Sequence, residues 1–136
     1  MTANAEFSDD QSLEQIEGDA WGEPAVGATK MMVTVYRLRH TPIGALPDGD
    51  LRILVGQRVG LDVLMPRVLA RLEQDPLLEG DFYEGDVLAA VLRIPANYWA
   101  AKPEQRARVE RIITAVENPD SALQPEIDTF NTSTRR

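Results

Sequence analysis

Hydrophobic residues recur at helical spacing through the middle of the chain. Between residues 61 and 72 they are Leu61, Leu64, Met65, Val68, Leu69 and Leu72. Intervals of three and four place them on one face, which predicts an amphipathic helix capped by Asp62 and ended by Asp75-Pro76. Residues 87–94 are nearly all apolar and follow Asp86 as a potential cap, so they predict a buried central helix that ends at the next proline.

Start signals mark the other predicted helices. Ser12-Leu-Glu-Gln15 has the pattern of a capping box and predicts a short helix directly after Ser12. Asp48 is the expected cap of a helix through residues 51–55. Pro103 is typical of the first position of a helix, and the apolar residues after it predict a last helix that reaches residue 117.

Residues 29–40 allow two interpretations. The apolar positions 32, 35, 36 and 38 fit a helix, whereas the β-branched content of residues 32–36 also fits a strand. We favour the helix, and the alternative stays open for residues 32–36.

These segments together predict an all-α fold, a small single-domain bundle of about five to six helices with flexible termini. Residues 12–117 form the expected helical domain. Residues 1–11 are polar and lack periodicity, which predicts a flexible acidic tail. Residues 118–136 are rich in Thr, Ser, Asp and Pro, so we expect a second flexible tail there.

The composition is that of a protein that folds in water. The chain has 136 residues, of which 43% are hydrophobic and 26% charged, and it contains no cysteine. Disulfides, thiolate nucleophiles and cysteine-ligated zinc are therefore excluded. No apolar run reaches the length of a membrane span, and the polar N-terminal segment lacks the features of a secretory signal. We therefore expect a cytoplasmic protein that does not bind a membrane.

The negative charge is concentrated in two segments. The formal net charge is −8, and residues 1–24 hold seven acidic residues and no basic one. Residues 73–86 hold six acidic residues and again no base, whereas the rest of the chain is slightly basic. Such blocks are often solvated segments that aid solubility, but a negative patch also attracts a basic partner. Nucleic acid is a disfavoured partner, because the basic residues are dispersed and have acidic counterparts within the chain.

No group of residues has the pattern of an active site. His40, the one histidine, stands beside Arg39 at an expected helix end and lacks a serine or carboxylate at the spacing of a catalytic triad. Residues 75–86 have the length of an EF-hand loop with Gly80 at the sixth place, but leucine stands at the third place and aspartate at the last. Glycine-rich phosphate-binding motifs are absent. We expect no enzymatic activity, no metal and no cofactor.

Several short motifs occur in a characteristic order. They are Ser12-Leu-Glu, Gly18-Asp-Ala-Trp-Gly-Glu-Pro24, Asp50-Leu-Arg-Ile-Leu-Val-Gly-Gln57, Gly60-Leu61, Glu79-Gly-Asp-Phe-Tyr-Glu-Gly-Asp86, Leu88-Ala-Ala-Val-Leu-Arg93 and Trp99. In this combination the chain resembles the small bacterial immunity proteins of contact-dependent growth inhibition (CDI) systems, over about residues 12–117. The resemblance implies a cytosolic, non-enzymatic inhibitor that binds the C-terminal toxin domain delivered by a sibling cell, often a nuclease.

The charge pattern and the resemblance together locate the expected interface. A nuclease needs a cationic surface for its substrate, and an acidic protein can cover that surface. The expected toxin-binding residues are Glu73, Asp75, Glu79, Asp81 and Glu84. The expected structural anchors are the aromatic residues Trp21, Phe82, Tyr83 and Trp99. The alternative is an acidic cytosolic adaptor or regulatory subunit that binds a basic protein partner, and formation of homo-oligomers stays open.

Overall fold

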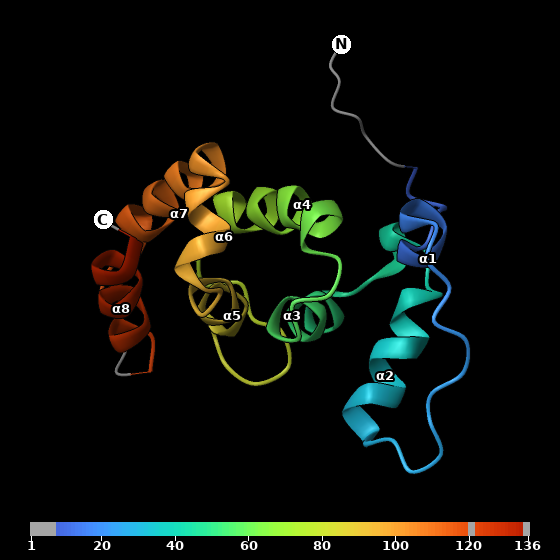
Figure 1. Cartoon of the computed structure of the whole chain (residues 1–136). Coiled ribbons are helices and arrows are strands. Elements are labelled where there is room, and N and C mark those ends of the chain that lie inside the picture. The colour runs from blue at the N-terminus through green and yellow to red at the C-terminus, as the bar shows by residue number, and fades with distance from the viewer. Residues whose placement is uncertain (1–7, 120–121, 135–136) are drawn as a thin grey trace.

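The computed structural model describes residues 8–119 and 122–134, which are helical and contain no β-strand. The helices are α1 (Leu13–Glu17), α2 (Lys30–Arg39), α3 (Asp48–Gly56), α4 (Leu61–Gln74), α5 (Asp86–Leu92), α6 (Ala96–Ala100), α7 (Pro103–Ala115) and α8 (Gln124–Thr134), with a 3-10 helix η1 at Ile43–Ala45 (Figure 1). The predicted all-α fold is confirmed, although the described residues form eight α-helices rather than five or six. Residues 32–36, where a strand was the alternative, lie within α2.

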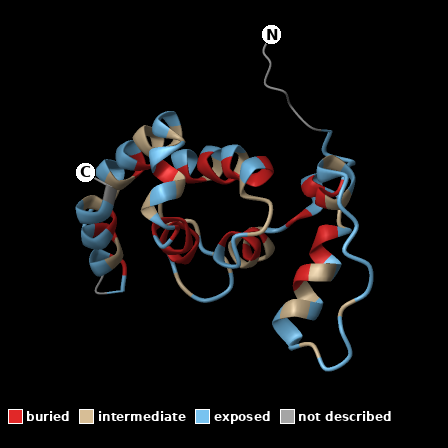
Figure 2. Ribbon diagram, in the orientation of Figure 1, coloured by how far each residue is buried: buried red, intermediate tan, exposed pale blue. Residues whose placement is uncertain are grey.

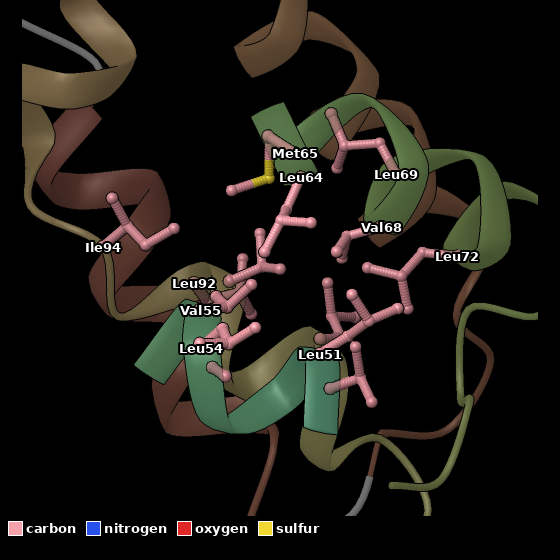
Figure 3. Packing of buried hydrophobic residues seen from close by; sticks show 14 of the residues in the cluster. Leu51, Leu54, Val55, Leu64, Met65, Val68, Leu69, Leu72, Leu92 and Ile94 are labelled. Atoms are coloured by element: carbon pink, nitrogen blue, oxygen red, sulfur yellow. The ribbon is translucent and has the colours of Figure 1, made fainter. Parts of the chain in front are cut away.

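Helix α5 lies at the centre of the helical body. Every residue from Asp86 to Leu92 is buried, as the apolar pattern predicts (Figure 2). The helix packs against α3 and α8, while α4 contacts α3 and α7. Side chains such as Leu54 of α3, Leu64 of α4 and Leu92 of α5 share one hydrophobic core (Figure 3). This core holds the helices that the connecting segments join, including the segment between α4 and α5.

Two helix starts follow the sequence signals. The N–H of Ser12 donates to Oε1 of Gln15 at 2.9 Å, and the N–H of Gln15 donates to Oγ of Ser12 at 3.3 Å, which completes the predicted capping box of α1. Pro103 is the first residue of α7. Its missing N–H costs nothing there, because the first N–H groups of a helix have no intrahelical partner.

The three aspartates expected as helix caps lie inside their helices instead. Asp48, Asp62 and Asp86 each belong to the first turn of α3, α4 or α5. The cap positions are occupied by Pro47, Gly60 and Gly85. A carboxylate in the first turn still faces the positive end of the helix dipole, so the acidic residue is favourable there without capping.

The segment expected to be a flexible C-terminal tail forms a packed helix. Leu123, Ile127 and Phe130 are at most 5% exposed, and the spacing of four and three residues places them on one face of α8. The ring of Phe130 meets Trp99 edge-on, with centroids 5.8 Å apart. The tail predicted for residues 118–136 is therefore wrong for the described residues 122–134.

The N-terminal segment expected to be a tail is attached to the fold where the structure describes it. The carbonyl of Asp9 accepts a hydrogen bond from the N–H of Gly44 at 3.0 Å, and that of Gln11 accepts one from Ile43 at 2.8 Å. Residues 1–7 of the predicted tail lie outside the described residues.

Helices α1 and α2 form an arm beside the main body (Figure 1). Arg39 of α2 is 1% exposed, and its guanidinium pairs with Glu17 at 3.2 Å and donates to the carbonyl of Asp19. Trp21, an expected anchor, is 38% exposed and lies over this guanidinium at 4.2 Å from its ring centroid. It also contacts Tyr36 at 5.2 Å between centroids. Trp21 therefore packs the segment between α1 and α2 against the surface of α2, and it does not reach the main core.

Candidate functional site

The second acidic segment forms a loop between α4 and α5. We call residues 75–85 the acidic loop (Figure 1). The backbones of Glu79 and Glu84 pair as an isolated antiparallel bridge, and the N–H of Gly85 donates to the carbonyl of Leu77 at 3.1 Å. The loop therefore folds back on itself as a tight turn, with residues 80–83 at its tip.

One buried carboxylate holds the tip of the acidic loop. Asp86 is 3% exposed. It accepts hydrogen bonds from the backbone N–H groups of Gly80, of Phe82 at 2.9 Å and of Tyr83 at 3.4 Å. Burial raises the pKa of Asp86, but the three N–H donors and Arg52, whose Nε lies 3.8 Å away, outweigh it and leave the pKa below its ordinary value. Asp86 therefore stays charged and fixes the conformation of the tip.

Four of the expected toxin-binding carboxylates lie in the acidic loop. The exposed side chains are those of Asp75, Glu79, Asp81 and Glu84. In the described part of the chain, none of the four forms an ion pair with a basic side chain. Their negative charge is therefore uncompensated and faces the solvent.

The carboxylate of Asp81, although exposed, also lies close to the start of α3. Its carboxylate lies so close to Gly49, in the first turn of α3, that a Cβ at this glycine would come within 2.4 Å of its oxygens. The N-terminal end of a helix carries a partial positive charge, which favours a carboxylate at this place. The absence of a side chain at Gly49 thus allows the loop to approach α3.

Glu73, the fifth expected binding residue, belongs to a different contact. Its two carboxylate oxygens accept hydrogen bonds from Nε and Nη2 of Arg108, both at 2.8 Å. The hydrogen bond from Arg108 lowers the pKa of Glu73. This bidentate pair joins α4 to α7 and compensates the charge. The structure therefore separates Glu73 from the carboxylates of the acidic loop.

The aromatic residues of this region differ in burial. Trp99 is fully buried, and its Nε1 donates to the carbonyl of Ile94 at 3.3 Å. Tyr83 is half-buried. Phe82 is 69% exposed, and the guanidinium of Arg52 lies 4.4 Å from its ring centroid. Phe82, one of the expected structural anchors, lies outside the core, because its backbone is held at the loop tip.

The acidic loop and the helices around it lie within a stretch that matches a known family. A family model of CDI immunity proteins matches residues 15–109, from α1 into α7, which is more than half of the chain. This chain belongs to the CDI immunity proteins. The resemblance that the sequence motifs indicate is thereby confirmed. No curated protein matches the chain.

The N-terminal acidic segment of this immunity protein is used within the fold. The observed pairs are Asp9 with Arg67, Glu14 with Nε2 of His40 at 2.9 Å, and Glu17 with Arg39 at 3.2 Å. His40 also contacts the carbonyl of Tyr36 through Nδ1 at 2.8 Å, so it connects α1 to α2. The two acidic segments therefore differ: the first is partly neutralised by Arg39 and Arg67, whereas the acidic loop forms no ion pair within the described residues.

Two of the pockets lined by described residues of the immunity protein do not include the tip of the acidic loop, residues 80–83. One of about 220 Å³ lies between the end of α5 and α8, where Arg93 pairs with Glu126 at 2.8 Å. The other, of about 150 Å³, lies between α4 and α7 beside Glu73. Among the described residues, no group of three or more His, Cys, Asp or Glu side chains could hold a metal ion. Within the same residues, no helix combines the length and apolar content that a membrane span needs.

Two residues of the site escape sequence reasoning. Asp86 stands directly before an apolar run, and this pattern predicts a helix cap. It gives no indication that the carboxylate accepts hydrogen bonds from the preceding loop. Arg52 lies 30 positions before Phe82, and no local pattern connects the two. Only the packing of α3 against α5 brings them together.

Proposed function

We propose that this protein binds and neutralises the toxin domain of its own CDI system, and that this toxin is a nuclease that it blocks in the cytosol. Membership of the CDI immunity proteins supports toxin neutralisation. The observation that favours a basic partner is the acidic loop, where Asp75, Glu79, Asp81 and Glu84 carry charge that no base in the described chain compensates. A nuclease has the complementary surface, because it must hold phosphates.

The acidic loop suits this role for two physical reasons. Exposed charge of one sign attracts the opposite surface over roughly 8–10 Å at physiological salt and speeds encounter. In addition, Asp86 holds the tip through the backbone N–H groups of residues 80, 82 and 83, so the loop does not have to be ordered when the partner binds. Occupation of the toxin's phosphate-binding surface by carboxylates would exclude the nucleic-acid substrate.

The test is a titration of the purified chain against the C-terminal domain of the toxin encoded immediately upstream. We expect a one-to-one complex by analytical ultracentrifugation, and loss of RNA or DNA degradation that is complete at one equivalent. A binding partner whose activity persists in excess immunity protein would contradict neutralisation and favour the adaptor role. If the immunity protein neutralises the toxin, but the toxin alone degrades neither RNA nor DNA, only the nuclease assignment is contradicted.

A further inference from the structure

Phe82 is an apolar side chain in a strongly charged setting. It is 69% exposed, more than Trp21 at 38%, the other exposed large aromatic residue among those described. Its sequence neighbour Asp81 and the bridge residues Glu79 and Glu84 are exposed carboxylates. A phenyl ring surrounded by charges that attract a basic surface will be brought into contact with that surface.

The ring of Phe82 is also held in place from the protein side. Its backbone N–H donates to Asp86 at 2.9 Å, and the guanidinium of Arg52 lies over the ring at 4.4 Å from the centroid. A planar guanidinium on an aromatic face is an attractive arrangement, and 69% of Phe82 stays exposed beside it. The aromatic group is therefore presented in a defined orientation, without the loss of mobility that binding otherwise requires.

We propose that Phe82 is the apolar anchor of the toxin interface and inserts into an apolar pocket of the toxin that is bordered by Lys and Arg side chains. This inference rests on the proposed function and specifies the chemistry of its partner surface. Binding energy in protein interfaces is concentrated in a few central, desolvated residues, and a polar rim surrounds them. Phe82 has the central position here, the carboxylates of the acidic loop form the rim, and Arg52 is a positioning residue.

The decisive experiment measures association and dissociation rates of the upstream toxin domain with the Phe82→Ala variant at low and high salt. We expect dissociation to become at least about 30-fold faster at both salt concentrations, with the association rate changed less than about twofold. Phe82→Trp should keep slow dissociation. The matched control is Val33→Ala, which shortens an apolar side chain that is 48% exposed on α2. Thermal unfolding should be the same for all three variants and the wild type.

A double-mutant cycle tests the positioning role of Arg52. Arg52→Gln should accelerate dissociation about three- to tenfold in the wild type and leave it unchanged in the Phe82→Ala background, because the two residues then act through one ring. A loss that is equal in both backgrounds would show that Arg52 does not act through Phe82.

The outcomes separate the anchor from the function on which it rests. If the wild type binds and neutralises the toxin but Phe82→Ala dissociates at the wild-type rate, the anchor is overturned and the proposed function stands. If the wild type does not bind the toxin, both are overturned. An accelerated dissociation that disappears at high salt would also overturn the anchor, because contact with an apolar pocket is not screened by ions.

Discussion

Asp86 connects the buried core to the exposed tip of the acidic loop. An isolated carboxylate in an apolar environment is strongly unfavourable unless its oxygens are hydrogen-bonded. Here three backbone N–H groups and the nearby Arg52 stabilise the charged form, although only 3% of the residue is exposed. The same bonds satisfy the backbone N–H groups of Gly80, Phe82 and Tyr83 at the tip. Loop conformation is thus tied to a charge in the core.

Replacement of Asp86 by asparagine should therefore destabilise the protein. We expect the free energy of unfolding at pH 7 to fall by about 2–3 kcal/mol, because the amide accepts fewer hydrogen bonds and carries no charge. The native pKa of Asp86 lies below its ordinary value of 3.8, so its stabilising contribution is present above about pH 4 and is lost as the pH falls through the native pKa. Urea unfolding at pH 7 and pH 3 measures the difference between wild type and variant.

The difference should be larger at pH 7 than at pH 3, because the contribution of the charge begins to decrease below about pH 4. Asp10→Asn, at an exposed carboxylate outside the loop, is the control and should stay within about 0.5 kcal/mol of the wild type. A difference for Asp86→Asn that does not decrease toward acid pH would contradict the assigned role of its charge.

Residue-level predictions succeeded where the signal was local. The capping box at Ser12 and the proline at the start of α7 depend on neighbours within three or four positions, and both are found. The role of Phe82 depends on how a loop lies against α3, which no neighbouring residue reports. Glu73 was grouped with the acidic loop for the same reason, since its partner Arg108 is 35 positions away.

At the scale of elements, the helices with a dense apolar face were predictable and α8 was not. The apolar stripe of α4 and the continuous apolar run of α5 are each sufficient to predict a helix. Helix α8 has three buried apolar residues among many polar ones, and its stability comes from packing on α5 and α6. Tertiary contacts of this kind supply most of the stability of short helices in proteins. The spacing of Leu123, Ile127 and Phe130 was the available signal.

Phe130→Ala should show that α8 belongs to the core. Removal of a buried phenyl ring that contacts Trp99 should lower the free energy of unfolding by about 3–5 kcal/mol, as measured by urea denaturation. Thr129→Ala changes the neighbouring exposed position and should alter it by less than about 0.5 kcal/mol. Equal, small effects of the two substitutions would mean that α8 does not contribute to the core.

At the scale of the whole molecule, the net charge of −8 conceals two different kinds of acidic segment. Acidic residues near the N-terminus pair with Arg39, His40 and Arg67 and tie α1 and the segment before it to the fold. Those of the acidic loop have no such partners among the described residues. Long-range attraction of a basic partner should therefore originate chiefly from the loop.

Charge reversal in the loop tests this distribution. Glu79→Lys combined with Glu84→Lys should slow association with the toxin domain about tenfold or more at low salt, and the effect should diminish as salt is raised. Stopped-flow association rates over a salt series measure it. The control is Glu23→Lys, an exposed acidic position between α1 and α2 that should have a much smaller effect. If Glu23→Lys slows association equally, the attraction depends on the net charge of the protein and not on the acidic loop.

The division between the fixed backbone of the acidic loop and its exposed side chains has an evolutionary consequence. Gly80, Gly85 and Asp86 determine the path of the backbone, while positions 79, 81, 82 and 84 contribute side chains that bury little surface within the chain. If the acidic loop is the toxin interface, as proposed, substitutions at those four positions should alter which toxin is recognised at little cost to folding. One helical scaffold can therefore diversify alongside changing toxins, by exchange of a few side chains on an unchanged loop.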